Sequence, residues 1–326
     1  MSVKSTIDDF KSLSANERRK VYEALSEIMT EHVKIDSSFE NKVNTCPCCG
    51  EKLSKNGRRP SGVQKYICKS CGKSCDSLSN TLFSGTHKSS DTWKTFIKCT
   101  LECKTLRECS AECNVSTTTA FQWRHKLLDA IQELLKDVKL SGIIEADETF
   151  LTKSYKGQHS LPRKAKERGT PSNKRGLSKD KLCIPCFIDR NGHVAAGVTN
   201  DGVVSIAGLS KMRKHIAEHS DLCTDNAHAY AVFCDDLHLT RHIVKSHGGK
   251  KYHVQHVNSI HSRFKNLVNH RFRGVSSRYV NGYIALIAWN TSNNEPNKVE
   301  KLIAQLFHVG KGCKWAEINK RQSIPI

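Results

Sequence analysis

The chain has 326 residues, of which 52 are Lys or Arg and 32 are Asp or Glu, so its formal net charge is +20. This length favours two or three modules over one small domain. No apolar run reaches the roughly 18–20 residues of a membrane span, and the N-terminus lacks the apolar stretch of a secretion signal. The composition therefore predicts a soluble, cytoplasmic protein without a membrane partner. A basic excess of this size indicates a polyanionic partner, with a basic surface that binds nothing as the alternative.

Residues 1–40 are expected to form an N-terminal helical segment. Ser14 and Glu17 have the spacing of a capping box. Apolar residues then follow at helical intervals: Val21, Leu25, Ile28 and Met29.

Residues 41–80 contain two Cys-x-x-Cys pairs, with 19 positions from Cys49 to Cys68. Four thiolates at this spacing suit tetrahedral zinc, and a Gly directly after each pair permits the tight turn that such a site needs. We therefore predict a zinc ribbon with four ligands: Cys46, Cys49, Cys68 and Cys71. Cys48 and Cys75 do not fit the paired spacing and are expected to be spare thiols. Basic neighbours such as Lys52, Arg58 and Lys69 favour nucleic acid as the partner, with a purely structural ribbon as the alternative.

Residues 88–136 are expected to form a helix-turn-helix DNA-binding domain. Residues 106–113 suggest a short helix and Asn114–Ser116 a turn, after which Ser116 suits the N-cap of a second helix over 117–128. The expected inward side chains are Cys109, Cys113, Val115, Phe121 and Leu128. The side chains expected to reach DNA are Thr117, Thr118, Gln122, Arg124 and Lys126. An ordinary helical hairpin is the alternative.

From residue 140 to residue 295 the pattern alternates strands and helices, which predicts an α/β domain. The expected strands are 142–151, 182–188, 193–199, 222–225 and 241–244, and the expected helices are 206–219, 227–234 and several from 257 onward. Asn191-Gly192 indicates a hairpin. Pro185 argues against a central position for its strand unless a bulge lies there. Residues 153–181 are polar and basic and are expected to form a long mobile loop, and residues 296–326 a C-terminal tail.

Carboxylates interrupt the expected core strands. Glu145, Asp147 and Glu148 lie within the first strand, where burial is costly unless a divalent metal compensates the charge. Strand alternation places Glu145 and Asp147 on one face and Glu148 on the other. Asp225 ends a second strand, a position where α/β folds expose ligating residues. A solvent-facing strand and a helix-capping role for Asp225 are the alternatives.

A helix after Val257 offers a third set of polar side chains. Asn258, His261 and Lys265 fall within an arc of about 60°. A separate apolar arc is expected to pack on the sheet: Val257, Ile260, Phe264, Leu267 and Val268. A solvated polar face is the alternative for the first arc.

Several motifs resemble a known family in the same order along residues 45–290. They are Cys46-Pro47-x-Cys49, Tyr66-x-Cys68-Lys69-x-Cys71-Gly72-Lys73, Thr119-Ala120-Phe121-x-Trp123-Arg124-His125-Lys126, Asp147-Glu148-Thr149, Lys174-Arg175-Gly176-Leu177-Ser178, Asp189-Arg190-x-Gly192, Thr224-Asp225, His256-Val257-Asn258-Ser259-Ile260-His261-Ser262-Arg263, Phe272-Arg273-Gly274-Val275-Ser276 and Tyr279. Together they resemble the DDE-type transposases of bacterial insertion sequences, in the group with a zinc ribbon and an Asp-Asp-Asn triad.

The resemblance implies an RNase H-like catalytic domain with a mixed five-stranded sheet flanked by helices, preceded by the zinc ribbon and the helix-turn-helix. It places the catalytic triad, and the ligands of Mg²⁺ or Mn²⁺, on Asp147, Asp225 and Asn258, with Lys265 and His261 near the phosphate. An amide is a weaker metal ligand than a carboxylate, so help from His261 or Glu145 stays open.

The implied activity is binding of terminal inverted repeats, followed by metal-dependent DNA strand cleavage and strand transfer. The implied partners are double-stranded DNA, as transposon ends and target, and further copies of the chain, at least during synapsis. The implied location is the bacterial cytoplasm, at the nucleoid when DNA is bound. The alternatives are a DNA-binding regulator with an inactive transposase domain, and an RNase H-like nuclease or resolvase.

Overall fold

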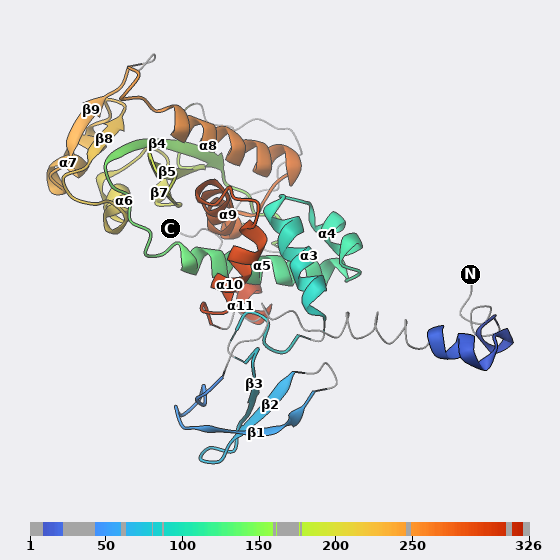
Figure 1. Ribbon diagram of the computed structural model, residues 1–326. Coiled ribbons are helices and arrows are strands. Elements are labelled where there is room, and N and C mark those ends of the chain that lie inside the picture. Colours follow the sequence, from blue (N-terminus) through green and yellow to red (C-terminus); the bar gives the residue numbers. More distant parts are fainter. Residues whose placement is uncertain are drawn as a thin grey trace. The chain divides into compact units, whose positions relative to one another are not determined.

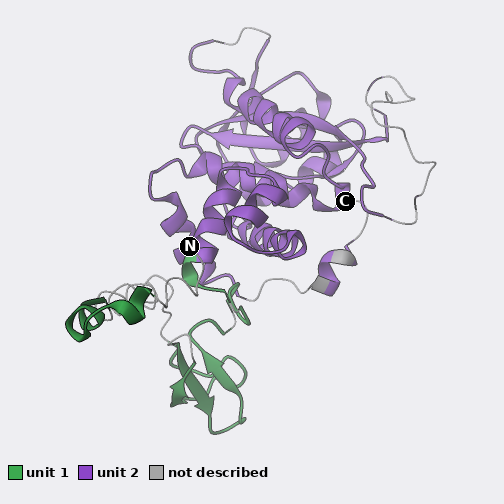
Figure 2. Cartoon of the chain, turned by 90° about the vertical axis from the view of Figure 1, so that its right-hand side faces the viewer, with its two compact units in different colours: residues 1–91 green, residues 92–326 purple. Residues whose placement is uncertain are grey.

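The computed structural model describes residues 9–21, 43–59, 63–79, 81–86, 88–158, 161, 176, 178–245, 249–310 and 315–321. The chain divides into two compact units, residues 1–91 and residues 92–326 (Figure 2). None of the helices in the described part of the chain combines the length and apolar character that crossing a bilayer requires.

The first unit contains helical turns and a small sheet. Residues 9–12 and 15–21 are helical, and the expected capping box is confirmed: the Ser14 N–H donates to the Glu17 carboxylate, and the Glu17 N–H donates to Ser14 Oγ. Leu25, Ile28 and Met29 lie outside the described residues. Further on, β1 (Leu53–Arg58), β2 (Gln64–Cys68) and β3 (Ser74–Asp76) form an antiparallel sheet in that order.

A mixed sheet organises the second unit (Figure 1). Its order is β6-β5-β4-β8-β9, and β7 also pairs with β5. The bounds are β4 Ile143–Thr152, β5 Lys181–Asp189, β6 Val194–Ala196, β7 Asn200–Asp201, β8 Asp221–Thr224 and β9 Thr240–Ile243. β5 is antiparallel to β4 and to β6, whereas β8 is parallel to both β4 and β9. The expectation of a mixed sheet is confirmed, with a sixth strand in addition to the expected five.

Helices cover both faces of this sheet. α6 (Ile206–Ser210) and α7 (His228–Asp236) pack over one face, where Tyr230 and Phe233 of α7 contact Phe187 of β5. α8 (Gln255–Asn266) lies along β4 and β5 on the other face, and α9 (Val280–Ser292) lies on β6. The expected apolar arc of α8 is buried, as the sequence pattern requires. The expected helix over 206–219 is shorter, because α6 ends at Ser210 and a separate 3₁₀ turn covers Arg213–His215.

Pro185 lies in an interior strand, and an irregularity like the expected bulge lies beside it, because residues 184–185 of β5 face residues 197–199 between β6 and β7. β5 pairs with β4 from Ile144↔Asp189 to Thr152↔Lys181 without a register shift. On its other side β5 pairs with β6 at residues 186–188 and with β7 at residues 182–183. Pro185 therefore stands where β5 changes partner, so its missing N–H leaves no ladder bond unmade.

A helical cluster packs beside the sheet (Figure 1). It comprises α3 (Ser90–Leu101), α4 (Leu106–Glu112), α5 (Thr117–Leu134), α9 and α10 (Lys298–Leu306). Trp93 stacks on Trp123 with ring centroids 4.0 Å apart, which joins α3 to α5. α5 and α9 approach closely at Gly282, where an added Cβ would lie 3.0 Å from the Leu128 Cβ.

The expected C-terminal tail contains packed structure. α10 buries three apolar side chains, Leu302, Ile303 and Leu306, and Trp289 Nε1 of α9 donates to Gln305 Oε1 at 3.1 Å. α11 (Trp315–Asn319) contacts α5. Residues 298–306 therefore belong to the helical cluster, because their apolar side chains recur on one helix face. Most of the expected mobile loop over 153–181 lies outside the described residues.

A buried imidazole in this cluster makes the stability of the second unit pH-dependent. His125 lies between aromatic rings, 4.3 Å from the Phe121 centroid and 4.1 Å from that of Tyr279. Burial, with nearby arginine charges, lowers the pKa of His125 to about 3. Since the unfolded chain then binds a proton that the folded chain does not, stability falls as the pH drops below the ordinary His value.

We expect His125→Gln to remove this dependence. Between about pH 7 and about pH 5 the wild-type free energy of unfolding should fall by about 2 kcal/mol more than that of the variant. Urea unfolding at the two pH values measures it, and His228→Gln, at an exposed position of α7, is the matched control. Equal pH dependence of wild type and His125→Gln would show that His125 does not carry the effect.

Candidate functional site

Asp147 and Asp225 lie at corresponding positions of two adjacent parallel strands. The β4–β8 register pairs Glu145 with Cys223. Asp147 is two residues beyond Glu145 in β4, and Asp225 is two residues beyond Cys223, directly after β8. The backbone therefore brings the two carboxylates together. Burial raises the pKa of Asp147 and the charge of Asp225 raises it further, while the Glu148 N–H and Lys265 act in the opposite direction.

α8 adds an imidazole and an ammonium to the carboxylates. His261 is buried, and its Nδ1 lies 3.7 Å from Asp147 Oδ2. Burial, followed by the charge of Lys265, lowers the pKa of His261 to about 4, so the ring is neutral at neutral pH. Asn258 and Lys265 are exposed, one turn on either side of His261. The structure thus gathers Asp147, Asp225, His261 and Lys265, and it places Asn258 on the same helix.

Glu148 faces the opposite side of β4, as strand alternation predicts. Tyr230 of α7 donates its hydroxyl to Glu148 Oε2 at 3.1 Å. Burial raises the pKa of Glu148 to about 7, and the charges of Asp147 and Asp225 contribute further. Asp147 and Glu148 are thus half-buried on opposite faces of β4, and the exposed Asp225 raises the pKa of both.

Glu145 makes a different set of contacts from Asp147. Its carboxylate is 1% exposed and accepts hydrogen bonds from the main-chain N–H groups of His256 and Val257, at 2.8 and 3.2 Å. Arg190 and the His253 and His256 rings also contact it. Glu145 therefore binds the start of α8, and it lies two residues before Asp147 in β4. Sequence reasoning missed Arg190 and His256 as its partners, although both lie in motifs that carried the family resemblance.

The chemistry of the donor set fits a hard divalent cation. Carboxylate and amide oxygens are the ligands that Mg²⁺ and Mn²⁺ prefer, and a bound cation would favour the charged forms that burial disfavours here.

Comparison with known proteins shows what this part of the chain resembles. The family described as "ISXO2-like transposase domain" matches residues 139–291, which include β4, β8 and α8. A protein of the transposable element ISH50 of Halobacterium salinarum is 26% identical over 221 residues, which are 64% of this chain and 70% of that protein.

Solved structures with some likeness are transposase complexes. The pre-cleavage Mos1 transpososome shares 14% identity over 71% of this chain and 83% of that chain, with a TM-score of 0.26. The Mos1 strand transfer complex shares 13% identity over 71% and 82%, with a TM-score of 0.27. A TM-score this low does not establish a shared fold.

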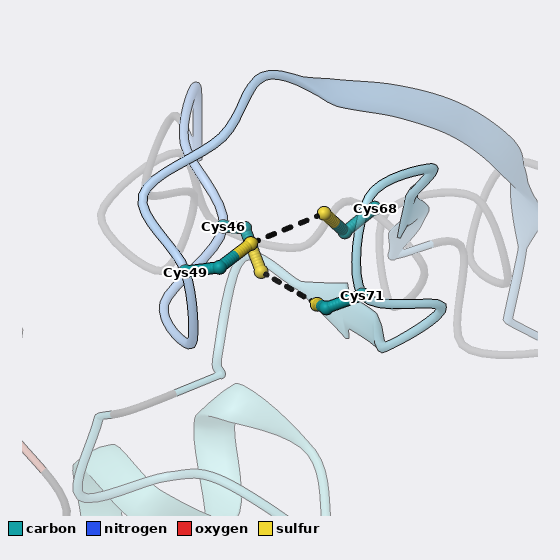
Figure 3. A group of neighbouring side chains, drawn as sticks. All are labelled: Cys46, Cys49, Cys68 and Cys71. Carbon is teal, nitrogen blue, oxygen red and sulfur yellow. Dashed lines mark hydrogen bonds between the residues drawn. The ribbon is translucent and has the colours of Figure 1, made fainter.

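Outside the residues that match this family, four cysteines form a compact cluster (Figure 3). The Sγ atoms of Cys46 and Cys71 are 3.6 Å apart, and those of Cys49 and Cys68 are 3.5 Å apart. A zinc ion with Zn–S bonds of about 2.3 Å separates tetrahedral sulfurs by about 3.8 Å. The cluster therefore has the size that a zinc site with four cysteine ligands requires. Hydrogen bonds from the main-chain N–H groups of Cys48 and Cys49 lower the pKa of Cys46 to about 6, whereas burial and the neighbouring thiols raise the pKa of Cys71 to about 12.

The two halves of the cluster have the same backbone design. The Gly50 N–H donates to the Cys46 carbonyl, and the Gly72 N–H donates to the Cys68 carbonyl, each at 2.9 Å. Both glycines have positive φ, 77° and 71°, a conformation that favours Gly. Cys48 and Cys75 are not in the cluster; Cys48 accepts a hydrogen bond from Lys73 Nζ at 2.9 Å.

The helix pair of α4 and α5 differs from expectation at Arg124. α4 and α5 are joined by a short turn, and Ser116 Oγ accepts the Thr119 N–H as the expected N-cap. Thr117 and Thr118 are exposed, and Gln122 and Lys126 are half-buried. Arg124 is 0% exposed, and its NH2 donates to the Lys104 carbonyl and to Cys109 Sγ. Its prediction as a DNA-contacting residue is wrong, because its position on α5 faces α4.

We expect the first unit to depend on zinc for its fold. The small β1–β3 sheet has few buried apolar residues, so about 10–16 kcal/mol of zinc binding would dominate its stability.

The purified chain should contain about one zinc per molecule by elemental analysis. A chelator should accelerate amide hydrogen exchange in β1–β3 and leave β4 and α8 protected. Cys49→Ser should behave in the same way, and Cys48→Ser, outside the cluster, is the matched control. A chelator that leaves exchange in β1–β3 unchanged would contradict the prediction.

Proposed function

We propose that the chain is an RNase H-like, DDE-type transposase that binds the ends of an insertion sequence and catalyses metal-dependent DNA cleavage and strand transfer. The observation that carries the proposal is the pairing of Asp147 and Asp225 on adjacent parallel strands, inside an ISXO2-like transposase domain. The relative encoded by a transposable element supports the same activity.

The strand arrangement supports the RNase H-like assignment. Taken in chain order, the domain has three antiparallel strands, β4, β5 and β6, followed by β8 and β9, which run parallel to β4. The central strand is the first one, and its neighbour on the parallel side is followed by the second aspartate. This arrangement agrees with the fold that the family resemblance implies.

We assign metal binding to three residues of the proposed site, phosphate binding to a fourth and a packing role to a fifth. Asp147, Asp225 and Asn258 would hold two divalent cations, which would neutralise the charge developing on the reacting phosphate. The exposed ammonium of Lys265 is available to a phosphate oxygen. The neutral His261 ring would pack against the Asp147 carboxylate, from which its Nδ1 is 3.7 Å away. Asp147 and Asp225 carry most of the ligand charge, because Asn258 contributes only a neutral amide oxygen.

DNA would be held by the zinc cluster and the helix pair. The net charge of +20 favours binding to a polyanion. The exposed threonines at the start of α5, Thr117 and Thr118, stand where a recognition helix contacts base edges, and Gln122 and Lys126 extend this face. We propose that these residues, without Arg124, bind the transposon ends, and that copies of the chain pair two ends for strand transfer.

The first test of the proposal is Asp147→Ala. We expect Mg²⁺-dependent cleavage of the element's own ends to fall by a factor on the order of 10²–10³ or more, since several kcal/mol of charge stabilisation are lost. End binding should stay unchanged. The melting temperature should not fall, because burial and Asp225 make the Asp147 charge unfavourable in the fold.

Asp235→Ala, at an exposed acidic position of α7, is the matched control and should cleave like wild type. Transfer of a labelled end into a plasmid separates a transposase from a nuclease. Full cleavage by Asp147→Ala would refute the assignment of the site. Absence of metal-dependent cleavage by the wild type would instead favour a DNA-binding regulator.

A second test compares Thr118→Ala with Arg124→Ala. Thr118→Ala should weaken end binding about tenfold without changing stability, because the side chain is exposed. Arg124→Ala should lower the free energy of unfolding by about 2–4 kcal/mol, because buried packing and hydrogen bonds are lost. Fluorescence anisotropy and thermal melting measure the two effects. If Arg124→Ala instead weakened end binding and left the free energy of unfolding unchanged, Arg124 would be a DNA-contacting residue after all.

A further inference from the structure

α8 begins without a cap of its own. Its N-cap residue, Val254, has no side-chain oxygen and makes no capping hydrogen bond. The second and third residues of the helix, His256 and Val257, therefore depend on another acceptor for their N–H groups. Glu145 of β4 supplies it, since its Oε2 accepts from both groups, at 2.8 and 3.2 Å. A carboxylate at this position also interacts favourably with the helix dipole.

The other oxygen of Glu145 is engaged as well. Oε1 contacts the guanidinium of Arg190, and His256 Nδ1 lies 2.6 Å from it. Arg190 NH2 also donates to the Lys251 carbonyl at 3.0 Å, which ties the segment before α8 to the same point. Glu145 is 1% exposed, so these contacts compensate a buried charge that water does not reach.

A metal site is the alternative for this cluster, because Glu145, His253 and His256 place ligand atoms within 4.8 Å of one another. Arg190 argues against it. Its NH1 already contacts Glu145 Oε1 and lies 2.7 Å from His256 Nδ1. A guanidinium thus compensates the carboxylate where a dication would have to bind. The arrangement is that of an anchored helix start.

The position of the anchor in the chain gives it a consequence for the proposed site. Glu145 is two residues before Asp147 on the same face of β4, and Asn258 directly follows Val257. One carboxylate thus connects the strand that carries the first proposed ligand to the helix turn that carries the third. We infer that Glu145 is a positioning residue that fixes the start of α8 and, through it, the place of Asn258 relative to Asp147. This inference rests on the proposed function.

The decisive variant is Glu145→Gln, which keeps the size of the side chain but replaces one acceptor oxygen by a donor. We expect faster hydrogen exchange at the first amides of α8 and a fall in the single-turnover cleavage rate on the order of 10- to 100-fold, because misplaced groups lose rate steeply. End-binding affinity should stay within about twofold, since the change does not touch the proposed DNA contacts. Glu300→Gln, the same change at an exposed position of α10, is the matched control and should show neither change.

A rescue experiment separates positioning from a general need for a buried charge. Val254→Asp places an ordinary N-cap at the start of α8. In the Glu145→Gln background this substitution should restore slow hydrogen exchange at the start of α8. The cleavage rate should rise again by at least about tenfold, because the rate was lost through a misplaced Asn258. If Glu145→Gln does not fold, restored folding and cleavage in the double variant support the inference, and failure of the double variant overturns it.

The possible outcomes separate the inference from the proposed function. Wild-type cleavage together with unchanged cleavage by Glu145→Gln would overturn the inference and leave the function standing. A loss of cleavage without faster exchange in α8, or one that Val254→Asp does not rescue, would also overturn it. The wild type could also fail to cleave, while Glu145→Gln speeds hydrogen exchange at the start of α8 and Val254→Asp slows it again. That result would support the capping role of Glu145 and refute the proposed function.

Discussion

The parallel pairing of β4 with β8 is the constraint on which the rest of the site depends. It brings Asp147 and Asp225 to corresponding positions, where burial and then the charge of Asp225 raise the pKa of Asp147. The fold holds them there because β4 is the central strand, paired over its length with β5 and covered by α8. The packing energy of a whole sheet thus keeps two carboxylates in an arrangement that they would not adopt alone.

Patterns with a strict period or spacing were the ones that the sequence could predict. The cluster of four cysteines, the strand alternation that separates Glu148 from Asp147, and the buried arc of α8 all follow from local geometry. The aspartates were recognisable as a pair because each stands in or directly after a short apolar strand. Predicting that the two aspartates lie close together required the strand order of the sheet. The family resemblance supplied that order as an expectation.

The errors occurred where a residue's role depends on a distant partner. Arg124 looked like a DNA-contacting cation because it is basic and lies in the second helix, but the Lys104 carbonyl and Cys109 hold it inside the helix pair. Pro185 argued against an interior strand, and only the gap between β6 and β7 makes it compatible. Whether Glu145 assists the metal site stayed open, because the start of α8, more than a hundred residues later, could not be placed beside it from sequence.

The two units obtain their order from different sources. The second unit is held by apolar packing in a sheet and a helical cluster, whereas the four thiols of the first unit have few buried neighbours and the spacing of a zinc site. In a cell with little available zinc, the chain would keep its aspartates in place and lose the ordered ribbon. Zinc supply and the redox state of the four thiols would then regulate the proposed DNA binding. The residues proposed to catalyse cleavage would stay unchanged.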